Sequence, residues 1–244
     1  MRKMTKVIAS CCAAFTLCFV IAAVCMIVGS SKNDNPVMAQ TTEQDVYVVS
    51  SAHDLAINIS DPAEMGQVST YVALVKVDSI DGANNYSEVS QEYVLPYTYG
   101  HMTVIENIVG DLPIGESLEF YRLGGTISAD QYYNGLTEVE KERMDFAKEN
   151  NATLASATYI KETSDGDIDV EAGKTYLVYM VNETAYYAKP NTYAIIGFEG
   201  GLREVRANSG ESITYSATGE AASVQVMNNF TGEWEDLSDV LSVQ

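Results

Sequence analysis

Four acidic side chains at alternating positions come closest, among the residues of this sequence, to the spacing of a binding site. They are Asp165, Asp167, Asp169 and Glu171, in the segment SDGDIDVE. Because side chains at alternate positions of an extended chain share a face, all four carboxylates would point the same way. Carboxylate oxygens are ligands that Ca²⁺ prefers. The pattern therefore makes these residues a candidate calcium site, with a solvated acidic loop as the alternative.

Motifs of enzymatic catalysis do not occur in the sequence. The chain has two histidines, His53 and His101. It lacks the G-x-S-x-G motif of serine hydrolases and the H-E-x-x-H motif of zinc peptidases. We interpret both histidines as ordinary polar residues, and nothing marks two of the many acidic residues as a glycosidase pair. The sequence therefore indicates a non-enzymatic protein, with a hydrolase that uses carboxylates as the alternative.

The charge of the chain narrows the choice of partners. The chain has 34 acidic and 14 basic residues. Residues 1–39 contain one of the acidic and four of the basic residues, so residues 40–244 contain 33 acidic and 10 basic side chains. A surface this negative repels nucleic-acid phosphates and anionic lipid headgroups. We therefore expect no nucleic-acid partner, and contact with a membrane only through the N-terminal segment. The expected partner is a protein, a peptide or a cell-wall or other cell-envelope component.

The N-terminal segment has the composition of an export signal. Three basic residues precede an uncharged run of 22 residues, Val7–Val28. A signal peptide has an apolar core of about 7–15 residues, whereas a membrane-spanning helix needs about 20. Residues 1–28 are therefore either a retained signal anchor, forming a hydrophobic helix, or part of a signal peptide cleaved after Ala39. Because basic residues hold the N-terminus in the cytoplasm, we expect an extracytoplasmic protein, membrane-anchored by a single pass or secreted.

The remainder of the chain differs from this segment in its cysteine content. All four cysteines lie in the hydrophobic run, as Cys11, Cys12, Cys18 and Cys25. The segment that ends at Cys11 is similar to a lipoprotein attachment site, which makes lipidation a third alternative for the N-terminus. Residues 29–44 are polar and are expected to be a tether. Residues 45–244 are expected to form one extracytoplasmic β domain without disulfides or cysteine-bound zinc.

Runs of β-branched and aromatic residues, bounded by turn residues, predict a mainly β domain with one or two helices. The predicted strands are Asp45–Ser50, Thr70–Ile80, Thr98–Val109, Glu116–Arg122, Leu154–Lys161, Thr175–Val181, Thr184–Ala188, Tyr193–Phe198, Leu202–Arg206 and Ala222–Met227. Thr137 and Glu140 have the spacing of a capping box, which predicts a helix over Glu138–Asn150. A second, short helix is expected around Asp236–Leu241. The segment Glu199–Gly201 is expected to be a hairpin turn.

The order of the stronger elements is strand, strand, strand, helix, strand, strand, which is the order of a five-stranded OB-type barrel. The segments that carry this order are Tyr71–Val77, VIENIVG at 104–110, GESLEFY at 115–121 and EAGKTYLVY at 171–179. Their arrangement resembles uncharacterised secreted proteins of Gram-positive bacteria and, more remotely, the OB-like barrel of netrin-type modules. The resemblance implies an OB-like antiparallel β-barrel between Tyr71 and Phe198. It implies no functional residue.

Together these observations predict a non-enzymatic extracytoplasmic module, membrane-tethered or secreted, that binds a protein, a peptide or a cell-envelope component. The hydrolase that uses carboxylates is the first alternative. A Ca²⁺-dependent adhesion or sensor domain is the second, and it depends on the four alternating acidic residues. Calcium at those residues is the one cofactor that the sequence suggests.

Overall fold

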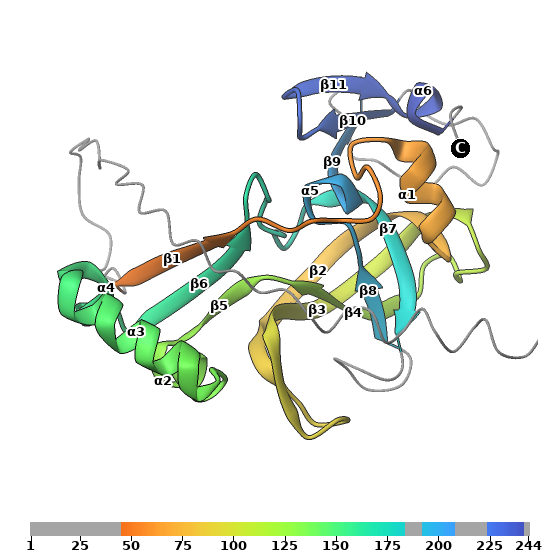
Figure 1. The fold of residues 1–244 in the computed structure, drawn as a ribbon. Helices are drawn as coiled ribbons and strands as arrows, with labels where there is room; N and C mark the ends of the chain where they lie inside the picture. The colour runs from red at the N-terminus through yellow and green to blue at the C-terminus, as the bar shows by residue number, and fades with distance from the viewer. Residues whose placement is uncertain (1–44, 184–191, 208–223, 242–244) are drawn as a thin grey trace, which may run out of the picture. The chain divides into compact units, whose positions relative to one another are not determined.

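The computed structural model describes residues 45–183, 192–207 and 224–241 (Figure 1). The predicted signal segment and polar tether, residues 1–44, lie outside the described residues, as does the predicted strand Thr184–Ala188. Strands make up 50% of the structure and helices 23%. This composition confirms the prediction of a mainly β protein.

Eight strands form the larger of two sheets. They are β2 (Tyr71–Ser87), β3 (Glu92–Val109), β4 (Ser117–Leu123), β7 (Thr175–Glu183), β8 (Thr192–Ile195), β9 (Leu202–Ala207), β10 (Val224–Asn228) and β11 (Glu233–Asp236). Their order in the sheet is β11-β10-β9-β7-β2-β3-β4-β8. β8 pairs with β7 as well as with β4, so the pairing that runs from β7 through β2, β3, β4 and β8 returns to β7. Within this ring of pairings, β4 and β8 are parallel and the other pairs are antiparallel.

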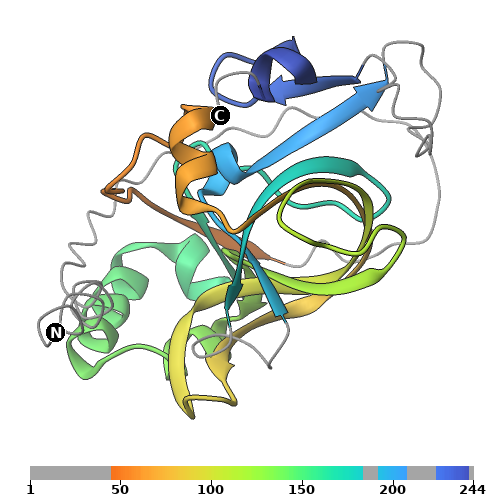
Figure 2. The same cartoon turned by 90° about the vertical axis from the view of Figure 1, so that its right-hand side faces the viewer.

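The two longest strands, β2 and β3, are strongly curved (Figure 2). Five register shifts interrupt their pairing, the first between Val72 and Ala73. Such irregularities bend a strand and increase its twist, which lets a long hairpin wrap around a core. The main core cluster includes Val75 of β2, Met102 of β3 and Phe120 of β4, each at most 1% exposed. The long hairpin therefore holds this core together.

The smaller sheet has three strands, β1 (Val46–Ser51), β5 (Gly125–Ser128) and β6 (Tyr159–Ser164). Their order is β1-β6-β5, with β1 parallel and β5 antiparallel to β6. Three helices lie beside this sheet: α2 (Ala129–Asn134), α3 (Glu138–Asn150) and α4 (Ala152–Ser156) (Figure 1). Ile127, Ile160, Tyr132 and Leu154 join sheet and helices in a separate core cluster. The smaller sheet thus has a core of its own.

The structure describes six helices, more than the one or two that we predicted. The others are α1 (Pro62–Val68), α5 (Phe198–Gly201) and α6 (Leu237–Leu241). Helix α3 has the predicted bounds, and its capping box is confirmed: the backbone N–H of Thr137 donates to the Glu140 carboxylate over 2.8 Å, and the Thr137 hydroxyl accepts from the Glu140 N–H. Within the described residues, no helix combines the length and the apolar character that crossing a membrane requires.

Two predicted elements were wrong. The strand predicted over Leu154–Lys161 begins only at Tyr159, because the Asn151 side chain accepts a hydrogen bond from the Leu154 N–H over 3.1 Å and caps α4 there. The turn predicted at Glu199–Gly201 belongs to helix α5. The short strands β5 and β11 were not predicted. Four residues are too few to show a period-two pattern, so these strands depend on their partners.

Candidate functional site

A groove with a volume of about 470 Å³ opens where the two sheets meet. Its walls come from β2, β3, β5, β6, the end of β4 and the loop between β6 and β7. The charged side chains that line it are Arg122, Lys161, Glu162, Asp167, Asp169 and Glu171. Aliphatic residues and threonines provide most of the remaining wall. This volume lies within the range of ligand sites in proteins, so the groove is the candidate functional site.

Arg122 and Asp167 form a buried ion pair in the groove, with 6% and 3% of their side chains exposed. Arg122 Nη2 donates to the Asp167 carboxylate, and Arg122 Nη1 donates to the carbonyl oxygen of Ile168 over 2.7 Å. Arg122 Nε is also buried, and it has no hydrogen-bond partner among the described residues. Burial raises the pKa of Asp167, although the charge and hydrogen bond of Arg122 oppose this shift. The groove therefore contains an ion pair with little net charge, in which the buried Nε–H of Arg122 has no acceptor among the described residues.

Two glycines bring the strands of the groove together. β4 ends at Leu123, and Gly124 follows with φ +88°, a conformation that side chains disfavour. At Gly125, a Cβ atom would lie 2.7 Å from the Thr98 hydroxyl oxygen. The chain can therefore turn from β4 into β5 and pass close to β3. This turn places the Arg122 guanidinium beside the loop that carries Asp167.

Two further acidic residues of the groove, Asp169 and Glu171, are also in ion pairs. Lys161 Nζ lies 2.6 Å from Asp169 Oδ2, and Lys174 Nζ lies 2.8 Å from Glu171 Oε1. The side chains of Asp169 and Glu171 are more than half exposed, so each ion pair is worth at most about 1 kcal/mol. Their main effect is to leave little uncompensated charge at the rim of the groove.

Three of the four predicted site residues, Asp167, Asp169 and Glu171, line the groove. The residues between them, Ile168 and Val170, pack against the main core cluster and also line the groove, so the whole segment from Asp167 to Glu171 borders it. Asp165 lies before a turn at Gly166, with φ +81°, and accepts a hydrogen bond from the Ser50 hydroxyl.

Each predicted carboxylate thus has a different protein donor. Within the described ranges, no three histidine, cysteine or acidic side chains come together as metal ligands would. Calcium binding at Asp165, Asp167, Asp169 and Glu171 stays a prediction.

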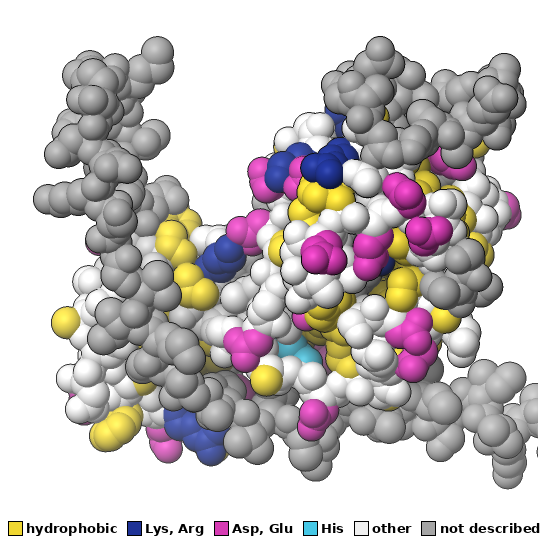
Figure 3. All heavy atoms as spheres, turned by 90° about the horizontal axis from the view of Figure 1, so that it is seen from above, with side chains coloured by type: hydrophobic (Ala, Val, Ile, Leu, Met, Phe, Trp, Pro, Cys, Tyr) yellow, Lys and Arg dark blue, Asp and Glu magenta, His cyan; other side chains and the backbone are white. Residues whose placement is uncertain are grey.

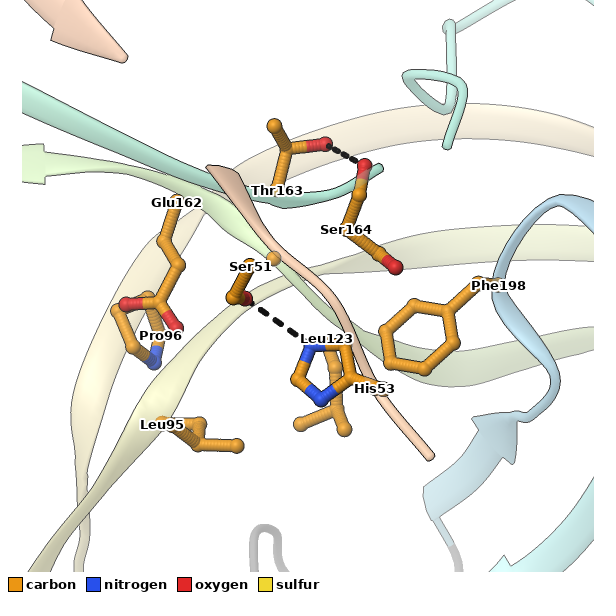
Figure 4. A pocket seen from close by; sticks show the side chains of 10 residues that line it. Ser51, His53, Leu95, Pro96, Leu123, Glu162, Thr163, Ser164 and Phe198 are labelled. Carbon is orange, nitrogen blue, oxygen red and sulfur yellow. Dashed lines mark hydrogen bonds between the residues drawn. The ribbon is translucent and has the colours of Figure 1, made fainter. Parts of the chain in front are cut away.

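A smaller cavity, of about 10 Å³, adjoins the groove, and Gly124, Glu162 and Thr163 line both (Figure 4). The His53 ring stacks on Phe198, with ring centroids 4.8 Å apart, and its Nε2 lies 3.1 Å from Ser51 Oγ. Burial lowers the pKa of His53, which favours the neutral ring. A neutral histidine beside a hydroxyl could accept a proton. However, the cavity has room for about one water molecule, so we assign it no catalytic role.

The backbone of Phe198 is in a strained conformation. Its φ is +46°, in the left-handed region that bulky residues rarely adopt, and the preceding Gly197 has φ +80°. At Gly201, a Cβ atom would lie only 1.5 Å from the Ile196 carbonyl oxygen. The strained turn at the start of α5 therefore depends on its glycines, and it presents the Phe198 ring to His53. Strain of this kind is concentrated at functional sites.

Glu162, on β6, has an unusual ionisation. Burial raises its pKa to about 7, although a hydrogen bond from the Tyr132 hydroxyl opposes the shift; the charge of Glu140 adds to it. Glu162 is among the residues that line the smaller cavity (Figure 4). Near neutral pH this carboxyl group is therefore divided between its protonated and ionised forms.

Sequence reasoning identified neither Arg122 nor Glu162. Arg122 is the single basic residue of the strand SLEFYRL, directly before Leu123 and two glycines. A lone cation at the end of an apolar strand is a signal that could have found it. Glu162 carries no such signal, because its hydrogen-bond partner, Tyr132 of α2, is distant in the sequence.

The surface outside the groove keeps the acidic character of the sequence. Figure 3 shows acidic side chains spread over the face that is seen there, with basic side chains in fewer places. Comparison with known proteins finds no family model that matches the chain and no curated protein with significant similarity to it. The candidate function is therefore argued from the groove itself.

Proposed function

We propose that this protein is a non-enzymatic extracytoplasmic module, membrane-tethered or secreted, that binds a protein, a peptide or a cell-envelope component in the groove. The observation that carries this proposal is the groove of about 470 Å³, a volume in the range of ligand sites, with charged and aliphatic side chains in its walls.

We also propose that the ring of pairings among β2, β3, β4, β8 and β7 is an OB-like barrel. Its support is the order of the pairs, with β4 parallel to β8 and the others antiparallel. Strands β5 and β6 of the smaller sheet and helices α2, α3 and α4 are inserted between β4 and β7, whereas β1 precedes β2. OB folds bind oligomers along the sheet and the loops at one end. The groove, lined partly by the hairpin of β2 and β3, lies beside this sheet.

The test is retention of envelope material by the full-length chain, purified in detergent. We would incubate it with cell-envelope fractions at physiological salt and identify what is retained. Thr126 is exposed and lines the groove, so Thr126→Trp should block the groove with little effect on folding. Thr153→Trp, at an exposed position on α4, is the matched control. Equal retention by both variants would reject the groove as the binding site.

A hydrolase is the second candidate, because the pKa of Glu162 is raised to about 7 beside the groove. Glycosidases use a carboxylic acid of raised pKa as the general acid. If Glu162 has this role, envelope polysaccharide should be cleaved with a rate that falls as pH rises through about 7, and Glu162→Gln should abolish cleavage. No release of soluble sugar from the polysaccharide by the unmodified protein would reject this candidate.

A further inference from the structure

The smaller sheet ends in an edge strand, β1, that its own sequence does not protect. β1 pairs with β6 along one edge, and among the described residues no strand pairs with its other edge (Figure 1). Soluble proteins commonly protect such an edge with a lysine, a proline or a bulge. β1 has none of these: its sequence is VYVVSS, and its pairing with β6 runs without a register shift. An unprotected edge of this kind is a template for another strand.

The backbone of β1 has hydrogen-bonding groups that are directed away from β6. The carbonyl oxygens of Asp45 and Ser51 accept N–H hydrogen bonds from β6 or the residue after it, over 3.3 and 3.1 Å. Successive residues of a strand direct their N–H and C=O groups to opposite edges, so Val46, Val48 and Ser50 direct theirs to the open edge. Within the described ranges, these outward groups have no backbone partner.

Two valines make the open side of β1 apolar as well as unpaired. Val46 and Val48 expose 41% and 54% of their surface. Tyr47 and Val49, which alternate with them, pack against the core of the smaller sheet. β-branched side chains at alternate positions are favourable contacts for a cross-strand neighbour. A strand added to β1 would therefore cover both exposed valines.

The charges near β1 decide which strand fits. From residue 33 to residue 75 the sequence has no lysine or arginine, and the exposed Asp45 and Asp165 lie at the two ends of β1. Lys161 of β6 is already in an ion pair. Two copies of this chain repel each other, because residues 40–244 contain 33 acidic and only 10 basic side chains. A segment with basic residues on either side of an apolar centre is attracted instead.

We propose that β1 is a binding site distinct from the groove, at which an extended segment of another protein adds to the smaller sheet as a fourth strand. Its apolar β-branched residues contact Val46 and Val48, and its basic residues lie near Asp45 and Asp165. In strand addition, backbone hydrogen bonds supply the affinity and alternate side chains supply the specificity. No residue from Val46 to Ser50 lines the groove, so this site does not depend on the function proposed for the groove.

The first test measures the binding of three capped heptapeptides to the full-length chain in detergent. One has alternating valine and threonine with a lysine at each end, and the second has glutamate at each end instead. The third keeps the lysines but has two central prolines, which lack N–H groups and interrupt a strand. We expect the first to bind at least tenfold more tightly than the others in titration calorimetry. No binding of the first peptide, or equally tight binding of either other peptide, would overturn the proposal.

Hydrogen exchange followed by NMR locates the bound strand. The amides of Val46, Val48 and Ser50 point to the open edge, so they should exchange at least tenfold more slowly with the lysine-flanked peptide than without it. The amides of Tyr47 and Val49 point toward β6 and are the internal reference, with a smaller expected change. Peptide binding without slower exchange at the three outward amides would place the site elsewhere and reject β1.

Two substitutions at Val48 separate the backbone of β1 from its side chain. Val48→Pro removes an outward N–H that β6 does not use, and should weaken peptide binding at least tenfold. Val48→Thr keeps the N–H and the branched shape, and is the matched control with Kd changed about twofold or less. Equal Kd values for the two variants would contradict strand addition. If Val48→Pro does not fold, Val48→Lys replaces it, and an unchanged Kd for that variant would reject the site.

The competing occupant of the edge is a second copy of this chain. Sedimentation of the unmodified full-length protein in detergent should show a monomer, because of the charge that two copies share. A dimer that Val48→Lys dissociates would assign the edge to a second copy and overturn the proposal.

Discussion

Arg122 in the groove and Arg203 in β9 are equally buried but differently satisfied. Each exposes 6% of its side chain and pairs with a carboxylate. Asp167, the partner of Arg122, exposes 3% of its side chain, whereas Glu235, the partner of Arg203, exposes 37%. Arg203 Nε donates to the Met227 carbonyl oxygen over 2.9 Å, and Arg122 Nε has no partner in the described part of the chain.

The pKa values of the two carboxyl groups, Asp167 and Glu235, are shifted in opposite directions. For Asp167, burial dominates and raises the pKa. For Glu235, burial acts in the same direction, but hydrogen bonds from Asn228 and Arg203 outweigh it and the pKa is lowered. The pair on β9 and β11 is thus in a favourable environment, while the pair in the groove is held in an unfavourable one. Groups kept at such a cost are concentrated at functional sites.

The largest expected difference between the two regions follows from removing each arginine. Arg122→Met leaves Asp167 buried without a cation and should lower the free energy of unfolding by about 3–5 kcal/mol. Arg203→Met should cost less, because Glu235 stays partly hydrated. Urea unfolding followed by circular dichroism measures both. Equal losses of unfolding free energy in the two variants would show that the environments of Arg122 and Arg203 do not differ energetically.

The next expected effect is on the pH dependence of stability, to which Glu162 and Glu235 contribute with opposite signs. The folded pKa of Glu162, about 7, lies above its ordinary value of 4.5. Its contribution to stability is complete below about pH 4.5 and is lost as the pH rises through about 7, by up to about 3 kcal/mol. Glu235, with a lowered pKa, contributes stability above its ordinary pKa that is lost as the pH falls.

Glu162→Gln isolates the first of these effects. The amide can still accept a hydrogen bond from Tyr132, so the variant should have a higher Tm than the unmodified protein at pH 8 and a similar Tm at pH 4.5. Glu149→Gln, at an exposed position on α3, should change neither. Thermal unfolding at the two pH values is the measurement. A Tm at pH 8 that does not rise in Glu162→Gln would contradict the assigned ionisation.

A smaller effect is expected from the conservative change to lysine. Arg122→Lys and Arg203→Lys should each cost about 1 kcal/mol of stability, because each arginine pairs with a carboxylate and also donates to a backbone carbonyl, of Ile168 and of Met227, that a single ammonium group would leave. Chemical denaturation of the two variants side by side measures both losses. A larger loss for Arg122→Lys would mean that its Nε is satisfied in the free protein, for example by water.

The smallest expected effect concerns calcium. Ligand at a hundred times its Kd would add about 2.7 kcal/mol to the free energy of unfolding. Because each of the alternating carboxylates already has its own donor, we expect millimolar Ca²⁺ to leave Tm unchanged. A clear rise that is lost in Asp169→Asn would instead support the calcium site and a rearrangement of the groove.

Local signals in the sequence were sufficient for some elements. The capping box at Thr137 and Glu140 predicted α3 with its observed bounds, because both partners lie within one turn. The apolar run that forms β7 was recognised for its β-branched and aromatic residues. The acidic segment was singled out from its own residues, and Asp167, Asp169 and Glu171 of that segment line the groove.

What the sequence could not supply depends on distant partners. Asp167 and Asp169 pair with Arg122 of β4 and Lys161 of β6, so a calcium cluster and an ion-paired rim have the same local pattern. β5 is only four residues long and owes its existence to pairing with β6. Glu162 is buried and accepts a hydrogen bond from Tyr132 of α2, and no feature of its own segment indicates either.

The parallel pairing of β1 with β6 has a consequence for folding. Val46 pairs with Tyr159, so 113 positions separate the two residues. Because a ribosome releases the chain from its N-terminus, β1 emerges long before its partner strand exists. Closing so long a loop is slow, and the exposed Val46 and Val48 must remain free of other strands meanwhile. The smaller sheet therefore cannot form before β6 has been released, and until then β1 is an unpaired strand that other chains could join.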